Sequence, residues 1–490
     1  MIDSPDSPLP ILTFDADDSW SDLPKLCKRF LTQDGFRRLQ KCLGECTKSV
    51  AIERHYIDKD YRDTFSNYHS KRFTTPNARC LRLHFFSKRI SRKDLRKSES
   101  LQRGYCGYSV VRPTRPYCLG RTLLDPIKLG YPHGGVCLCD ESLSIQGVPV
   151  SIRGFPFISQ DADVTVCAQS ALWMVIRYFS NRYSMYQEMY PYQITQLTRD
   201  YSIGRLAPSE GLTDWQMAEA LRQIGLSPLI YERESYPKDF EHIMYTYVES
   251  GIPVLASTND HVVACFGHFS DYGKAVNTKL RKFQRFSSSF FNQGFIINDD
   301  NAIPYQRLPL NNAGKSQPID SMIPFKEVEA FTAPLPPRVF LPAEQFETVA
   351  SGLLKSSRFG IRSCSPSLRG RPIVSRTFLT TGRSFKRYLD QRGMGHKLVF
   401  HVYCNMPLPH FIWVRELSTL DLYRKHRIIG EVLWDATRNV YEPSGWLALH
   451  YPERLFIDIG SALNTDRSVI KFDLDRSRDY PLMTHNLQSI

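Results

Sequence analysis

The chain has 490 residues, of which 42% are hydrophobic and 12% aromatic, and its formal net charge is +13. This composition excludes an intrinsically disordered chain, and no apolar run reaches the ~18 residues that a transmembrane helix requires. The length predicts about two to four domains, since one domain usually holds about 100–200 residues. The positive charge allows nucleic acid, an anionic membrane or an acidic protein as a partner but selects none of them.

The N-terminal region is predicted to begin with a flexible leader over 1–25, which is acidic and interrupted by prolines. It lacks the basic start and the apolar stretch of a secretory signal, so we expect a soluble, cytoplasmic protein without a membrane span. Apolar residues recur at helical spacing over 26–45, where Gly35 divides the pattern into two short helices. Strand-like runs such as 50–57 then predominate and predict a strand-rich N-terminal domain over 26–150.

Residues 151–305 are predicted to form a core domain, and a C-terminal region follows it. A polar linker at 306–325 leads to a mixed α/β C-terminal domain over 326–490. Helical periodicity is found near 342–355 and 382–392. Runs rich in β-branched and aromatic residues predict strands at 397–406, 410–417, 427–436 and 446–452.

Lysines and arginines gather in three stretches, at 88–97, 274–285 and 358–387. The ordinary explanation of such stretches is solvated loop and helix surface. Contact with nucleic acid or with an acidic partner is the alternative.

The segment after Gln160 has the features of a nucleophile at the start of a buried helix. Cys167 is followed by apolar residues three and four apart, which form one helix face. They are Ala168, Ala171, Leu172, Val175, Ile176 and Phe179. A helix N-terminus favours the thiolate form of a cysteine. The Gln160 side chain could donate to an oxyanion beside the backbone N–H of Cys167. A buried cysteine that begins a core helix is the competing interpretation.

A candidate base and a candidate acid follow in two strands. A polar turn precedes His261, which begins an apolar strand and could act as a general base. His268, at the far end of the same strand, is the alternative. A later strand, starting at Phe295, ends in Asp299 and Asp300. Either carboxylate could orient the imidazole, and Asp299 is the first choice. Two aspartates that cap a β-turn are the competing interpretation.

These motifs, in this order, resemble the papain-like peptidase domains that cleave double-glycine leaders from bacteriocin precursors. The resemblance covers about a third of the chain and implies a Cys167–His261–Asp299 triad with Gln160 as the oxyanion glutamine. It also implies an α+β fold, in which the helix that bears the nucleophile packs on an antiparallel sheet. Departures are Ala168 in place of a glycine, Asp300 in place of a proline, and a Gln160 one residue further upstream. The flanking regions resemble uncharacterised bacterial proteins that carry such a core.

The sequence therefore predicts a cysteine peptidase or amide hydrolase that acts on a protein or peptide. Acyl transfer, deamidation or transglutamination by the same triad is a second possibility. A non-catalytic, basic binding protein for nucleic acid or an acidic partner is a third. No cofactor is expected. The twelve cysteines lack the spacing of a zinc site, so we also expect no metal. The oligomeric state does not follow from the sequence.

Overall fold

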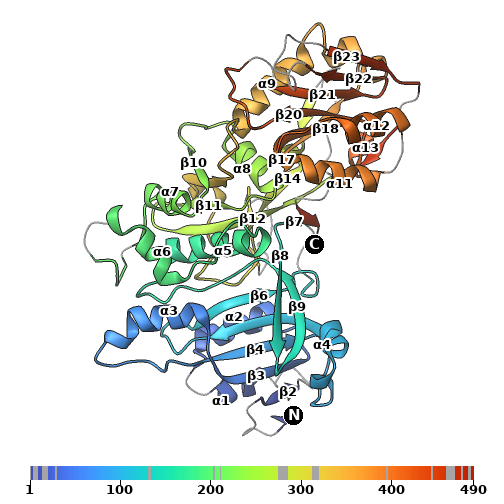
Figure 1. Cartoon of the computed structure of the whole chain (residues 1–490). Helices are drawn as coiled ribbons and strands as arrows, with labels where there is room; N and C mark the ends of the chain where they lie inside the picture. The colour runs from blue at the N-terminus through green and yellow to red at the C-terminus, as the bar shows by residue number, and fades with distance from the viewer. Residues whose placement is uncertain are drawn as a thin grey trace.

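A computed structural model shows that the chain has a mixed α+β fold (Figure 1). Thirteen α-helices and three large sheets are found in its described residues, and none of these helices is long and apolar enough to cross a membrane. The described residues are 2–3, 9–13, 20–27, 30–130, 134–201, 205–209, 211–273, 285–311, 319–392, 396–442, 445–459, 469–475, 478–483 and 487–489.

The N-terminal sheet has six antiparallel strands in chain order. They are β1 (Ile2–Asp3), β2 (Ile11–Thr13), β3 (Ser49–Tyr56), β4 (Cys80–Phe86), β5 (Tyr105–Val111) and β6 (Leu119–Leu124). Part of the expected flexible leader belongs to this sheet, because β2 pairs with β3 and Leu12 is buried. Four helices accompany the sheet: α1 (Asp22–Cys27), α2 (Gln33–Leu43), α3 (Lys59–Asn67) and α4 (Ser98–Gly104).

The predicted break between two short helices lies earlier than Gly35. Gly35 is inside α2, and its N–H donates to the hydroxyl of Thr32 over 3.1 Å. Threonine is a favoured N-cap because its oxygen satisfies a free N–H of the first turn. The cap, and not the glycine, therefore decides where the second helix begins.

The central sheet has the strand order β10-β16-β11-β12-β14-β15, and all neighbours are antiparallel. These strands are β10 (Ser227–Glu232), β11 (Val254–Ser257), β12 (Val262–Ser270), β14 (Asn292–Asn298), β15 (Gln306–Pro309) and β16 (Ala330–Leu335). Two short strands, β7 (Gly135–Val136) and β25 (Gln488–Ser489), extend it beside β12. The sheet thus includes strands from both flanking regions and one from the predicted linker.

Helix α5 (Cys167–Arg182) lies between the central and N-terminal sheets (Figure 1). Every residue from Ala168 to Phe179 is buried. A helix that is buried all round must be enclosed by other elements on each side. Its neighbours include α6 (Pro191–Leu197), α7 (Asp214–Gln223) and the hairpin of β8 (Cys139–Ile145) and β9 (Val148–Gly154).

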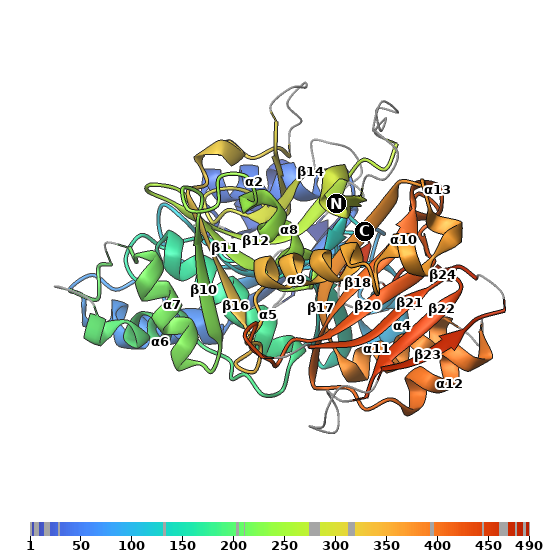
Figure 2. The same ribbon diagram turned by 90° about the horizontal axis from the view of Figure 1, so that it is seen from above.

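The C-terminal sheet has the order β13-β17-β18-β20-β21-β22-β23. Figure 2 shows it on one side of the molecule, with β10 and β16 on the other side and α9 between them. Its strands are β13 (Arg285–Ser287), β17 (Ile373–Thr381), β18 (Phe411–Thr419), β20 (Gly430–Asp435), β21 (Trp446–Tyr451), β22 (Arg454–Asp458) and β23 (Val469–Asp473). A separate pair joins β19 (Arg427–Ile428) to β24 (Tyr480–Pro481). The helices that complete the chain are α8 (Phe240–Glu249), α9 (Ala343–Lys355), α10 (Ile361–Cys364), α11 (Gly382–Arg392), α12 (Lys397–Asn405) and α13 (Leu420–Tyr423).

One strand prediction in this region is wrong. The sequence predicts a strand at 397–406, but Lys397–Asn405 form helix α12. Val399 and Tyr403 are its buried residues, and a spacing of four places both on one helix face. The β-branched and aromatic composition favoured a strand, but the tertiary contacts of this face decide the structure. The predicted helices near 342–355 and 382–392 are confirmed as α9 and α11.

Candidate active site

Cys167 is the first residue of α5, and its side chain is half-buried. The residue before it, Val166, provides no side-chain cap for the helix. The N–H groups of the first turn are therefore available to a negative charge at this end of the helix. This is the position that the sequence predicts for a nucleophile.

His261 directly precedes β12 and is held by a tight turn. Its N–H donates to the hydroxyl of Thr258 over 3.1 Å, and its carbonyl oxygen accepts from the N–H of Thr258 over 2.8 Å. Strand β14 runs antiparallel to β12, with Asn298 opposite Ala264. The residues just after β14 must therefore lie beside the residue just before β12. The register of the sheet brings Asp299 and Asp300 to His261.

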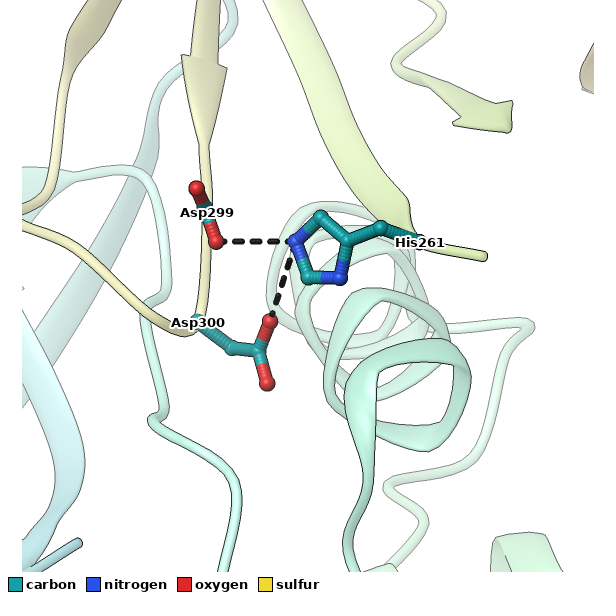
Figure 3. Close-up of side chains that lie close together, drawn as sticks. All are labelled: His261, Asp299 and Asp300. Atoms are coloured by element: carbon teal, nitrogen blue, oxygen red, sulfur yellow. Dashed lines mark hydrogen bonds and ion pairs between the residues drawn. The ribbon is translucent and has the colours of Figure 1, made fainter. Parts of the chain in front are cut away.

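The imidazole of His261 joins the predicted nucleophile to the predicted acid. Its Nε2 lies 2.9 Å from Oδ1 of Asp299 and 3.6 Å from Oδ1 of Asp300 (Figure 3). The Cys167 side chain is close enough to the same ring to raise its pKa. Residues from three separate segments thus meet at one ring.

The surroundings of His261 favour its protonated form. Burial opposes the charge and acts to lower the pKa, but hydrogen bonds to Asp299 and Cys167 and the charges of Asp299 and Asp300 outweigh it. Together they raise the pKa of His261 from 6.5 to about 10. The ring therefore carries a proton on both nitrogens at neutral pH.

The two aspartates differ in their environment. Asp299 accepts from His261 and also from the N–H of Asn301, over 2.9 Å. Asp300 is 2% exposed, and neither of its carboxylate oxygens has a hydrogen-bond partner within the described ranges. Burial, opposed by His261 and reinforced by Asp299, raises the pKa of Asp300 to about 7. Asp299 has the geometry of an orienting carboxylate, whereas Asp300 adds a nearby charge.

Gln160 lies beside this group. Its side-chain N–H donates to Oδ1 of Asn301, the residue that follows the two aspartates. Its backbone carbonyl accepts from the buried Arg112 guanidinium over 3.0 Å, and the same guanidinium holds the Ser159 carbonyl over 2.8 Å. The loop from Gln160 to Cys167 is shaped by Asp161, which accepts from three consecutive backbone N–H groups at 163–165.

His268, the alternative base, forms a hydrogen bond away from this group. Its Nε2 lies 2.5 Å from Oε2 of Glu249, a residue of α8. Glu249 also pairs with Arg376 of β17, over 2.5 Å. All three side chains are buried. His268 thus belongs to an ion network that joins the central and C-terminal sheets, at the opposite end of β12 from His261.

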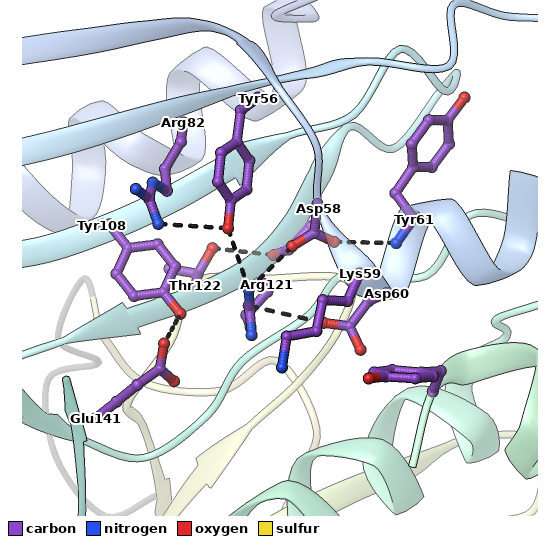
Figure 4. A network of polar contacts seen from close by, with 12 residues as sticks. Tyr56, Asp58, Lys59, Asp60, Tyr61, Arg82, Tyr108, Arg121, Thr122 and Glu141 are labelled. Carbon is purple, nitrogen blue, oxygen red and sulfur yellow. Dashed lines mark hydrogen bonds and ion pairs between the residues drawn. The ribbon is translucent and has the colours of Figure 1, made fainter. Parts of the chain in front are cut away.

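The N-terminal region supports the site through residues that the sequence did not single out. Asp60 of α3 accepts from the Trp173 indole over 2.9 Å and from Arg177 over 2.7 Å, both on α5. Figure 4 shows Asp60 within a larger network that includes Arg121. Arg38 of α2 donates to the Asp300 carbonyl over 3.0 Å. No local signal identifies these contacts, because each joins residues far apart in the chain.

His261, Asp299 and Asp300 could also hold a metal ion, since one ligand atom from each lies within 4.8 Å of the others. One nitrogen and two carboxylate oxygens suit a divalent transition metal. A metal on Nε2 would require neutral imidazole and would displace the proton that His261 shares with Asp299. Metal binding and the hydrogen bond to Asp299 are therefore mutually exclusive uses of Nε2.

No model of a known protein family matches the chain, and no curated protein shows significant sequence similarity to it.

Proposed function

We propose that the chain is a papain-like cysteine hydrolase that cleaves an amide bond in a protein or peptide. The observation that carries the proposal is the position of the His261 ring, which hydrogen-bonds to Asp299 and whose pKa is raised by the neighbouring Cys167 side chain. A nucleophile, a base that touches it, and a carboxylate that orients the base form the arrangement that covalent hydrolysis requires. The location of Cys167 at the start of a buried helix is a second support.

The reaction begins with a proton already on His261, because its pKa is raised to about 10. The Cys167 thiolate, whose proton His261 has taken, attacks the substrate carbonyl, and the backbone N–H of Cys167 and the amide of Gln160 stabilise the oxyanion. His261 then gives its proton to the leaving amine, and a thioester remains. The neutral ring accepts a proton from water, which attacks the thioester and releases the carboxylic acid.

The Gln160 side chain already has a hydrogen-bond partner. Its N–H donates to Asn301, so a substrate carbonyl oxygen would compete with that contact or use the second N–H of the amide. The loop on which it lies is anchored by Arg112 and Asp161. We therefore assign Gln160 as an oxyanion donor and Asn301 as the residue that holds it ready.

A proteome-derived peptide library tests the proposal. Wild-type protein is incubated with the library, and new termini are identified by mass spectrometry. We expect new termini that Cys167→Ala abolishes and that Cys404→Ala, a matched change at another half-buried cysteine, leaves intact. Identical termini from Cys167→Ala would refute the assignment. Activity that a chelator removes would point instead to a metal at His261, and products coupled to an added amine would indicate acyl transfer.

A further inference from the structure

A cavity of about 380 Å³ lies at the edge of the C-terminal sheet. It is formed where β13 runs parallel to β17, with Arg285 opposite Ile373, and where the chain leaves α9. Its apolar wall is made of Leu354, Leu368 and Ile373, which are buried. The volume lies within the range of small-molecule sites, about 300–1,000 Å³.

The polar lining of this cavity is cationic. Five basic side chains line it, and no described aspartate or glutamate does: the five are Arg285, Lys355, Arg362, Arg369 and Arg371. Lys355 and the last three are exposed at the rim, so the cavity is open to solvent. Arg285, the last residue of the basic stretch 274–285, therefore lies at one cavity with three arginines of the stretch 358–387, while 274–284 lie outside the described residues.

Arg285 is half-buried, whereas the other four cations are exposed. Its Nη1 is buried and has no hydrogen-bond partner among the described residues. Burial, together with repulsion from Arg415 and Arg362, lowers its pKa. Arg415 itself is neutralised by Glu347, so that carboxylate is already engaged. A buried guanidinium N–H without an acceptor is unfavourable, and a bound anion would satisfy it.

The backbone makes a tight turn beside the cavity. A Cβ atom on Gly360 would lie 2.3 Å from the Ser356 carbonyl oxygen, so only glycine permits this turn after α9. The turn places Ile361 and Arg362 across from Arg285 in the lining of the cavity.

We propose that this cavity binds a small anion with two or more phosphate groups. Several guanidinium groups around one volume match phosphate oxygens, which accept paired N–H donors from arginine. The charge of five cations calls for a multivalent anion, and the size of the cavity favours a small molecule over a nucleic acid strand. The apolar wall offers a surface for an organic group attached to the phosphates. This inference is independent of the proposed hydrolase activity.

Calorimetric titration of the full chain with inorganic tripolyphosphate tests the proposal, at about 0.15 M salt to suppress non-specific attraction. We expect saturable binding at one site. Arg285→Gln should weaken it about tenfold or more, the typical effect of losing a charge-assisted hydrogen bond. The double variant Arg369→Glu, Arg371→Glu alters only exposed side chains and should weaken binding further. It keeps the test decisive if Arg285→Gln does not fold.

A matched control separates the site from the overall charge. Arg338 and Arg383 are exposed and do not line the cavity, so Arg338→Glu, Arg383→Glu makes the same change in net charge elsewhere. This control should bind as the wild type does. Equal weakening by both double variants, or no saturable binding by the wild type, would overturn the proposal. So would a single-stranded oligonucleotide that binds through these arginines when tripolyphosphate does not.

A parallel titration with ATP distinguishes two sources of the phosphate groups. Tighter binding of ATP than of tripolyphosphate would identify a nucleotide, with its base on the apolar wall. Equal affinity would identify the phosphate chain alone as the recognised group. Both results support a polyphosphate site.

Discussion

The protonation of His261 should link the stability of the fold to pH. The folded state raises the pKa of His261 from 6.5 to about 10, so it binds this proton more tightly than the unfolded chain does. The resulting stabilisation is complete below pH 6.5 and is lost as the pH rises toward 10. At about 1.4 kcal/mol per pKa unit, the whole effect is about 5 kcal/mol, and about 3 kcal/mol of it falls above pH 7.5.

Urea denaturation of the wild type and of His261→Gln, measured from pH 7.5 to 10, tests this reasoning. The contributions of most other titratable groups to the pH dependence cancel when the two proteins are compared. In the wild type this pH range also lies above the pKa of about 7 for Asp300. The free energy of unfolding of the wild type should fall relative to that of the variant by about 3 kcal/mol. A difference that stays constant across the window would refute the raised pKa of His261.

Four further substitutions probe the candidate site and the network that supports it. Asp299→Asn should lower the pKa of His261 more than Asp300→Asn does, because Asp299 accepts its hydrogen bond. Carbon-13 NMR of labelled histidine measures the pKa of His261 in each variant. Equal shifts in the two variants would contradict the assignment of Asp299 as the orienting carboxylate. Gln160→Ala should slow turnover about 10²–10³-fold, as the loss of an oxyanion donor does, and should leave the rate of Cys167 alkylation unchanged. An equal loss of alkylation rate would indicate that Gln160 has a structural role. Asp60→Ala should lower the free energy of unfolding by about 3–5 kcal/mol in urea denaturation, because Arg177 of α5 and Arg121 of β6 lose this buried partner. A decrease below about 1 kcal/mol would show that the remaining contacts of the network compensate.

The local parts of the site could be predicted from the sequence. The apolar periodicity after Cys167 required a buried helix that begins near it, and α5 begins there. The polar turn and apolar run at His261 required a strand that begins next to it, and β12 does so. Both predictions depend on residues that are close together in the chain, where periodicity is informative.

The pairings across the site could not be predicted in the same way. The choice between Asp299 and Asp300 depends on which carboxylate faces Nε2, and the choice between His261 and His268 depends on the location of Glu249. The hydrogen bond between Asp60 and Trp173 joins residues more than a hundred positions apart. Such contacts are fixed by sheet register and helix packing, which a single sequence does not encode locally.

The pH dependence of Cys167 alkylation by iodoacetamide is the most direct test of the Cys167–His261 pair. Wild type is compared with His261→Ala, and Cys167→Ala identifies the modified peptide among those of the other cysteines. We predict fast alkylation that persists well below the pKa of about 8.5 for a free thiol, and its loss in His261→Ala. Alkylation that follows a free thiol, or that is equal in both proteins, would contradict the Cys167–His261 pair and with it the proposed hydrolase.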